Sequence, residues 1–244
     1  MEREFLQETI RNFSDGFLNL IFPLNCLICR RGLESDNKKY LCNNCWAKVR
    51  LLKEPLCSRC GRLSALSICL SCKTERHYFQ TARAVGLYEG VLRECIHLLK
   101  YGKKIYLAQF LGELLAESMR NDSNLRKADL LVPVPLDERR YRERDFNQAY
   151  LLAQVMNRYL KTPVSARNLS RTRIALPQAR LNRKQRRENV RELFQVGNAK
   201  EYQGKNILII DDVFTTGATV NECARVLRKA GAREINVLTV ARGE

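Results

Sequence analysis

The sequence predicts an α/β fold, in which helices flank a parallel sheet, preceded by an N-terminal helix and a double zinc-ribbon module. Two runs of branched aliphatic residues, 130–132 and 207–210, are typical of strands buried on both faces of a parallel sheet. Segments with apolar residues at helical spacing lie between them. Eight of the ten cysteines form Cys-x-x-Cys pairs, a spacing that predicts zinc sites.

This pattern divides the chain into three segments. Residues 1–23 repeat apolar side chains at helical spacing, which predicts an amphipathic helix that ends at Pro23. Acidic residues in this helix dilute the basic face that a membrane-surface helix carries, so we expect it to pack against protein. Residues 24–77 form the predicted double zinc ribbon, and residues 78–244 form the α/β domain.

The chain is strongly basic. With 43 Lys and Arg against 26 Asp and Glu, its formal net charge is +17, which predicts a polyanionic partner or substrate; a solvated basic surface is the alternative. No run approaches the ~20 apolar residues of a membrane span, so no transmembrane segment is expected. Paired cysteines without a cleavable signal predict a reducing cytoplasm, where any contact with the inner face of the membrane is made through partners.

The cysteine pairs predict two structural zinc ions. Two such pairs complete a tetrahedral site, and because every ligand is a thiolate, no coordination position stays open for catalysis. A segment this short is expected to fold only with its metal. The spacing favours successive pairing but leaves a cross-braced pairing open, and the module can either grip nucleic acid or brace the next domain. The predicted ligands are Cys26, Cys29, Cys42, Cys45, Cys57, Cys60, Cys69 and Cys72.

The stretch 207–219 carries the predicted ligand site. Asp211 and Asp212 fall at the carboxyl end of the aliphatic strand, where open α/β sheets bind their ligands. A turn of small and hydroxyl-bearing residues then runs into an amphipathic helix, whose N-terminal N–H groups suit a phosphate dianion. The two acids repel phosphate but suit sugar hydroxyls and Mg²⁺. These parts predict a ribose 5-phosphate site, although a Thr-Gly turn that only starts a helix is the alternative.

This string resembles the phosphoribosyl-pyrophosphate (PRPP) signature of type I phosphoribosyltransferases, which has four hydrophobic residues, two acids, a short linker and Thr-Gly. The resemblance implies the type I phosphoribosyltransferase fold for residues 78–244 and PRPP bound with magnesium. It implies that Asp211 and Asp212 hold the ribose hydroxyls as the catalytic pair. Some members with purine substrates carry an Asp, a candidate general base, where Thr215 stands; its absence argues against purine salvage, while a transferase in nucleotide salvage or metabolism with no DNA role stays the alternative function. The implied 5-phosphate residues are Thr215, Thr216, Gly217, Ala218 and Thr219.

Two further segments have possible roles in this site. In the type I transferases, the loop after the strand that matches 129–135 receives pyrophosphate, which assigns that role to Val134 and Pro135; a rigid strand end is the alternative. Lys100 ends a predicted helix, where its charge stabilises the negative pole of the helix dipole. It can also reach a phosphate.

The residues after the strand at 129–135 make the resemblance more specific, from the type I transferases as a whole to one family. A Val-Pro-Val-Pro strand end, the residues Arg-Asp-Phe-Asn-Gln-Ala at 144–149, the PRPP string and the cysteine ribbons occur together in the competence-protein ComF family, which includes GntX-like proteins. The chain resembles this family over nearly its full length. The family usually has Gly where Asp145 stands; Asp tolerates a positive φ better than most residues, but its charge weakens phosphate attraction. Arg139, Arg142 and Arg144 are predicted nucleic-acid contacts.

Residues 171–191 hold eight basic residues and one acid, Glu188. Charge this dense is excluded from a core, and self-repulsion is expected to keep part of the segment mobile. In type I transferases a flexible hood from this region closes over PRPP, and residues such as Thr172 and Asn189 match the ComF pattern. Tracking the phosphates of single-stranded DNA and a solvated basic face are the alternatives. The predicted contacts are Arg171, Arg173, Arg183, Lys184, Arg186 and Arg187.

Two functions follow. One is an enzyme that transfers phosphoribose from PRPP to an acceptor that the sequence does not identify, with the protein supplying position and electrostatics. The other is a binding module that senses PRPP while its basic surfaces hold single-stranded DNA. The resemblance to ComF implies a role in natural transformation and DNA uptake, with other competence proteins as partners. A purine-gene regulator ranks lower because no helix-turn-helix is predicted.

Overall fold

The computed structural model describes residues 25–33, 40–172 and 192–243. The chain forms two compact units, Met1–Val49 and Arg50–Glu244. The second pair of Cys-x-x-Cys motifs therefore belongs to the same unit as the sheet, and the segment predicted as one module, 24–77, is divided between the units. The helix predicted at 1–23 lies outside the described residues.

The first unit contains a small turn and one short helix. An antiparallel bridge between Asn25 and Gly32 closes the turn that carries Cys26 and Cys29. Helix α2 (Asn43–Trp46) carries Cys45 on its buried side.

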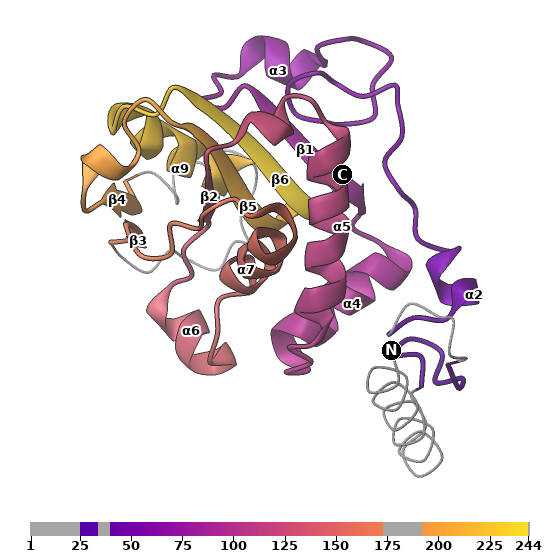
Figure 1. Ribbon diagram of the computed structural model, residues 1–244. Coiled ribbons are helices and arrows are strands. Elements are labelled where there is room, and N and C mark those ends of the chain that lie inside the picture. The colour runs from indigo at the N-terminus through magenta and orange to yellow at the C-terminus, as the bar shows by residue number, and fades with distance from the viewer. Residues whose placement is uncertain (1–24, 34–39, 173–191, 244) are drawn as a thin grey trace, which may run out of the picture. The chain divides into compact units, whose positions relative to one another are not determined.

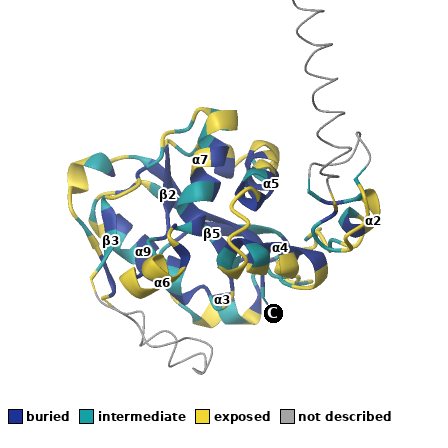
Figure 2. Ribbon diagram, turned by 90° about the horizontal axis from the view of Figure 1, so that it is seen from below, coloured by how far each residue is buried: buried dark blue, intermediate teal, exposed yellow. Residues whose placement is uncertain are grey.

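A parallel sheet of four strands organises the second unit. Its order is β1 (Thr81–Leu87), β6 (Glu234–Arg242), β5 (Asn206–Phe214) and β2 (Leu130–Pro133), as Figure 1 shows. Every neighbouring pair is parallel, which confirms the α/β prediction. The aliphatic residues of β5 and β2 are buried, as expected for strands covered on both faces (Figure 2).

Helices cover both faces of this sheet (Figure 1). On one face, α4 (Gly90–Tyr101) packs against β1, and α5 (Leu107–Asn121) and α7 (Gln148–Leu160) pack against the strands and each other. On the other face, α9 (Ala218–Lys229) packs against β5 and β6. Residues 215–217 connect the carboxyl end of β5 to the start of α9, so they form the turn of small and hydroxyl-bearing residues that the sequence predicts.

Several short elements complete the unit. Helix α3 (Leu70–Thr74) belongs to the second cysteine group, and α6 (Glu138–Arg144) follows β2. Strands β3 (Leu169–Arg171) and β4 (Phe194–Val196) form an antiparallel pair, and 3₁₀ turns occupy Leu125–Lys127 and Ala199–Glu201. The sequence did not predict α6 or the β3–β4 pair. Among the described residues, no helix has the length and apolar character needed to cross a membrane.

Candidate functional site

The predicted zinc ligands gather into two groups of four. In each group the sulfur atoms all lie within 4.8 Å of one another. The Sγ atoms of Cys29 and Cys42 are 3.6 Å apart, and those of Cys60 and Cys69 are 3.8 Å apart. A tetrahedral zinc site with Zn–S bonds of ~2.3 Å has sulfur separations of about 3.8 Å, so both groups fit zinc. The groups are Cys26, Cys29, Cys42 and Cys45, and Cys57, Cys60, Cys69 and Cys72, which is the successive pairing.

The backbone of each group is bent so that its sulfurs converge. In the second group the N–H of Cys57 donates to Arg62 O, the N–H of Gly61 donates to Cys57 O, and Gly61 has a φ of 66°. The thiols within each group are unequal: burial is outweighed by backbone hydrogen bonds that lower the pKa of Cys26 and Cys57 to about 6, whereas burial raises the pKa of Cys45 to about 12 and also raises that of Cys72. Zinc binds the deprotonated form of all four sulfurs, so a bound metal favours the thiolate at the cysteines that burial keeps protonated.

Asp211 and Asp212 lie in β5 shortly before its last residue, Phe214, and alternate between its two faces, as successive residues of a strand do. Asp212 Oδ2 lies 2.7 Å from the Nζ of Lys100 on α4. Burial lowers the pKa of Lys100, but the negative charge of Asp212 has a larger effect in the opposite direction, so the pKa of Lys100 is raised. Burial, followed by the charge of Asp212, raises the pKa of Asp211 to about 7. The two acids are therefore unequal, because among the described residues Asp212 has a cation in direct contact and Asp211 has none so close.

The turn after the acids is shaped by Gly217 and Phe214. Gly217 is the N-cap of α9 with a φ of 77°, and a Cβ there would lie 2.4 Å from Cζ of Phe214. Thr216 Oγ1 accepts a hydrogen bond of 3.3 Å from the N–H of Ala218. Only glycine fits this position, so the backbone is held close to the ring at the start of α9, where N–H groups lack partners within the helix.

Arginines surround the other side of the site. Arg144 is buried, with its guanidinium 4.9 Å from the centre of the Tyr101 ring. Arg171 Nη1 lies 3.2 Å from Asp137 Oδ2, and Arg140 Nε lies 3.6 Å from the same oxygen. Burial lowers the pKa of Arg171, and its Nε is buried without a hydrogen-bond partner among the described residues. Arg144 and Arg171 are therefore held by side chains distant in sequence, whereas Arg140 pairs with Asp137 three residues before it.

These features meet around one hollow of about 190 Å³ at the carboxyl ends of β5 and β2. Its lining combines the acids, the turn and four cations, so an anion with sugar hydroxyls fits its chemistry. We call it the site hollow. The residues that line it are Lys100, Val134, Pro135, Leu136, Arg140, Arg144, Asn147, Gln148, Arg171, Asp211, Asp212, Val213, Phe214, Thr215, Gly217, Ala218, Thr219 and Val220.

The predicted ligand residues therefore lie together, with Thr216 beside this lining. Lys100, Val134 and Pro135 join the acids and the turn, although they come from separate segments of the chain. Arg144 and Arg171, predicted as nucleic-acid contacts, line the same hollow. Arg139 and Arg142 are exposed on α6, where each pairs with a glutamate one turn away. Arg173, Arg183, Lys184, Arg186 and Arg187 lie outside the described residues.

Arg140 and Asp137 also belong to this cluster of charges, and neither was predicted as a site residue. Asp137 is buried, caps α6 by accepting from the N–H of Arg140, and contacts two arginine side chains. An Asp directly after Val-Pro-Val-Pro-Leu and before a charged segment is a helix N-cap signal, and that signal was available in the sequence. Asp145 has a φ of 67°, which is the positive value expected where the ComF family usually has Gly.

Comparison with known families agrees with both parts of the chain. Residues 17–73 match the double zinc ribbon domain, and residues 149–244 match the phosphoribosyl transferase domain. The amidotransferase that uses glutamine and PRPP in Bacillus subtilis overlaps 53% of the chain at 22% identity and a TM-score of 0.36, and 25% of its own chain is covered. The fold and site define a protein with a type I phosphoribosyltransferase fold and two zinc sites of four cysteines each.

Full-length relatives define the family. "Competence protein F" of Haemophilus influenzae is 31% identical over 91% of this chain and 98% of its own length. "DNA utilization protein YhgH" of Escherichia coli K12 is 32% identical over 91% and 99%. "Competence protein ComFC" of Bacillus subtilis is 27% identical over 91% and 96%. The chain belongs to the competence protein F (ComF) family.

Proposed function

We propose that the site hollow binds PRPP with magnesium, and that the protein acts in DNA uptake by handling single-stranded DNA. PRPP binding is supported by one observation: the turn before α9, the two acids and four cations all line the same hollow. PRPP carries a phosphate at one end, a pyrophosphate at the other and ribose hydroxyls between them, so each group of residues has one matching part of the ligand.

In this proposal the segment Thr215–Thr219, which leads from β5 into the start of α9, holds the 5-phosphate through backbone N–H groups and hydroxyls. Asp211 accepts hydrogen bonds from the ribose hydroxyls. Arg144 and Arg171 hold the pyrophosphate beside Val134 and Pro135, and the buried Nε of Arg171 gains a partner there. Lys100 holds the Asp212 side chain in place through their 2.7 Å contact.

Magnesium fits the oxygen ligands that the hollow offers, since Asp211 lines it beside the proposed pyrophosphate position. When bound with PRPP, the ion neutralises charge on the leaving pyrophosphate. The residues of the chain supply position and electrostatics, because neither a cysteine nor a histidine is among the described residues that line the site hollow. An enzyme of this kind transfers phosphoribose to an acceptor and releases pyrophosphate.

The sharpest test is Asp211→Asn, measured by calorimetric titration with Mg–PRPP. The change keeps the shape of the side chain but removes the charge, so we expect affinity to fall by at least tenfold, or about 1.4 kcal/mol. Asp211 makes no ion pair within 4.0 Å among the described residues, so thermal unfolding should stay within a few degrees of the wild type. Undiminished affinity would show that PRPP binds elsewhere.

Asp212→Asn is the matched comparison. It should lower both affinity and stability, because it leaves the Lys100 ammonium, whose side chain is 17% exposed, without its partner. Adding Lys100→Met to Asp212→Asn removes the unpaired charge and should restore stability without restoring affinity. Recovery of both would assign Asp212 a structural role alone.

Release of pyrophosphate distinguishes an enzyme from a PRPP sensor. Labelled PRPP and magnesium would be incubated with the protein and single-stranded DNA or a panel of bases. Release that depends on one acceptor and disappears in Asp211→Asn supports transfer. Binding without release supports the sensor.

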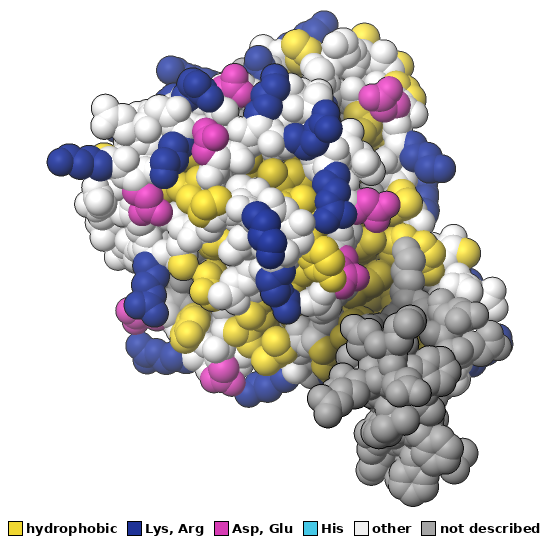
Figure 3. All heavy atoms as spheres, viewed as in Figure 1, with side chains coloured by type: hydrophobic (Ala, Val, Ile, Leu, Met, Phe, Trp, Pro, Cys, Tyr) yellow, Lys and Arg dark blue, Asp and Glu magenta, His cyan; other side chains and the backbone are white. Residues whose placement is uncertain are grey.

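The DNA role is supported by the competence and DNA-utilization names of the relatives and by one surface of the second unit. Residues 101–106 are exposed throughout and include Tyr101, Tyr106 and two lysines. Tyr141 on α6 is also exposed. Tyrosine rings and cations together suit stacked bases and phosphates. Lysines and arginines are also spread over the face shown in Figure 3, with acidic residues between them.

Replacing Lys103 and Lys104 with glutamine tests this surface. Each phosphate contact of a single strand contributes about 0.7 to the slope of log affinity against log salt, so the slope should fall by about 1.4 at most. Arg126→Gln with Lys127→Gln is the control, because both residues are exposed before the amino end of β2. Equal effects of the two pairs would indicate a diffuse charge effect rather than this surface. Neutralising Arg183, Lys184, Arg186 and Arg187 tests the predicted loop in the same assay.

A further inference from the structure

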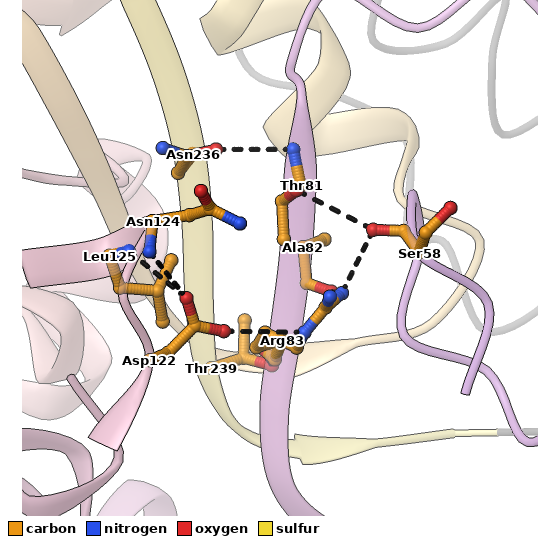
Figure 4. Close-up of polar contacts among 9 residues, drawn as sticks. All are labelled: Ser58, Thr81, Ala82, Arg83, Asp122, Asn124, Leu125, Asn236 and Thr239. Carbon is orange, nitrogen blue, oxygen red and sulfur yellow. Dashed lines mark hydrogen bonds and ion pairs between the residues drawn. The ribbon is translucent and has the colours of Figure 1, made fainter. Parts of the chain in front are cut away.

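The second cysteine group is fixed to the sheet of its own unit. Its four cysteines belong to the buried cluster formed by β5, β6 and α9. Ser58 O accepts hydrogen bonds from Thr81 Oγ1 at 3.4 Å and from Arg83 Nη1 at 3.1 Å, while Arg83 Nε lies 3.5 Å from Asp122 Oδ2 (Figure 4). The N–H of Ala82 also donates to Arg59 O at 2.7 Å. The turn between Cys57 and Cys60 is therefore held against β1 by hydrogen bonds.

Arg242, the last residue of β6, connects the same group to the site. It is buried, and its Nη1 donates to Cys60 O at 2.5 Å. Its Nη2 lies 3.7 Å from Cys60 Sγ, a distance suited to an N–H···S hydrogen bond. A buried guanidinium needs a compensating negative charge, and a metal-bound thiolate supplies one.

The other face of Arg242 lies on Phe214. The guanidinium carbon is 4.6 Å from the centre of the Phe214 ring, and Phe79 meets the same ring at 6.1 Å in an edge-to-face arrangement. Gly217 lies directly against this ring, so closely that a Cβ would come within 2.4 Å of it. The position of the ring therefore sets the position of the backbone at the start of α9.

We infer that the second zinc site is a positioning element of the ligand site, and that Arg242 is the positioning residue between them. The metal-held sulfur of Cys60 fixes Arg242, Arg242 fixes the Phe214 ring, and the ring supports the turn at Thr215–Ala218. This inference rests on the proposed function for the identity of the ligand, but the mechanical link does not depend on it. Loss of the second zinc should therefore loosen the turn before it unfolds the sheet.

Hydrogen exchange in Arg242→Met tests the link without any ligand. This variant keeps the length and apolar stem of the side chain and removes the guanidinium. We expect amides of 214–219 to exchange several-fold faster than in the wild type, with amides of β2 unchanged. Arg233→Met is the control, because Arg233 is an exposed arginine directly before β6, and its Nε donates to Asn206 Oδ1 at the start of β5, away from the zinc group. Unchanged exchange at 214–219 in a variant that retains both zinc ions would overturn the inference.

Titration with Mg–PRPP then separates the inference from the proposed function. Arg242→Met should bind about tenfold more weakly, which lies within the usual range of roughly 5- to 150-fold for coupled sites. Arg242→Lys keeps the charge but not the paired N–H groups, so its affinity should lie between. If Arg242→Met exchanges faster but the wild type does not bind PRPP, the mechanical link is supported and PRPP is rejected as the ligand. Full affinity in Arg242→Met would reject the link as a determinant of binding.

If both variants fold poorly, the wild-type chain provides the test. Coupling between the equilibrium affinities of two sites is reciprocal, so bound PRPP should raise the affinity of the second site for zinc. Competition for zinc with a chelator, brought to equilibrium with and without PRPP, measures this affinity. Equal zinc retention with and without bound PRPP would overturn the inference.

Discussion

The two cysteine groups have the same motif and turn but different surroundings. In the first, Cys29 is exposed and the group belongs to its own compact unit. In the second, all four cysteines are buried in the core of the sheet unit. Four thiolates and one metal thus stabilise a small separate unit in one case and complete a larger core in the other. A shared motif identifies the metal, but its packing decides what the metal supports.

The residue after the second cysteine of each turn shows the difference most clearly. Arg30 and Gly61 occupy this position, with φ values of 64° and 66°. A Cβ at Gly61 would lie 2.5 Å from Ala82 O of β1, so a side chain cannot fit between the turn and the strand. Arg30 keeps the same backbone with a long, exposed side chain. Gly61 is therefore required by the close packing of this turn against β1, and not by the conformation of the turn alone.

The largest expected effect separates the two metals. Cys72→Ser should lower the Tm of the sheet unit by about 10 °C or more, because it opens a metal site within the core. Cys29→Ser should leave that transition within a few degrees. Far-UV circular dichroism follows the sheet unit, and the fluorescence of Trp46, the only tryptophan, follows the first unit. Equal losses in both variants would mean that the two groups support one cooperative core.

Gly61→Ala against Arg30→Ala tests docking with a smaller change. Gly61→Ala should cost about 2–4 kcal/mol, because it adds a clash to the strain of a positive φ. Arg30→Ala should change stability by less than about 1 kcal/mol, since Arg30 already accepts that strain. Denaturant unfolding of each unit gives the values. A similar small cost at both positions would contradict the close approach to β1.

The site hollow should respond to pH through the carboxylate of Asp211. Because burial raises the pKa of Asp211 to about 7, its carboxylate is largely protonated at about pH 6 and ionised at about pH 8. PRPP affinity should therefore rise several-fold across this interval, with zinc content constant. The raised pKa has the opposite effect on stability, since the folded state binds the extra proton and loses that contribution as pH rises towards 7. Calorimetry at three pH values, with Asp211→Asn as the flat control, measures the first effect.

Much of this structure could be predicted from the sequence. The aliphatic run of β5 was predicted as a buried parallel strand, and the two acids near its carboxyl end line the site hollow, because strands of this kind have a recognisable local sequence pattern. Helix α6 was missed, since seven residues dominated by charge show no apolar periodicity. The burial of Arg144 and Arg171 could not be predicted, because Tyr101 and Asp137, which accommodate them, come from distant segments.

The connection through Arg242 was also beyond sequence reasoning. Cys60, Phe214 and Arg242 are ordinary residues at their own positions, and only the pairing of β5 with β6 brings Phe214 and Arg242 side by side. The acid pair shows the same limit in another way. The side chains of Asp211 and Asp212 alternate between the two faces of the strand. Asp212 therefore contacts Lys100, whereas Asp211 has a raised pKa.

A crystal structure of the zinc-loaded protein with Mg–PRPP would locate the ligand directly. We expect the 5-phosphate at the backbone of Thr215–Thr219, the ribose hydroxyls at Asp211, and the Phe214 ring still between Arg242 and Gly217. PRPP bound outside the site hollow, or a 5-phosphate away from the start of α9, would contradict this expectation.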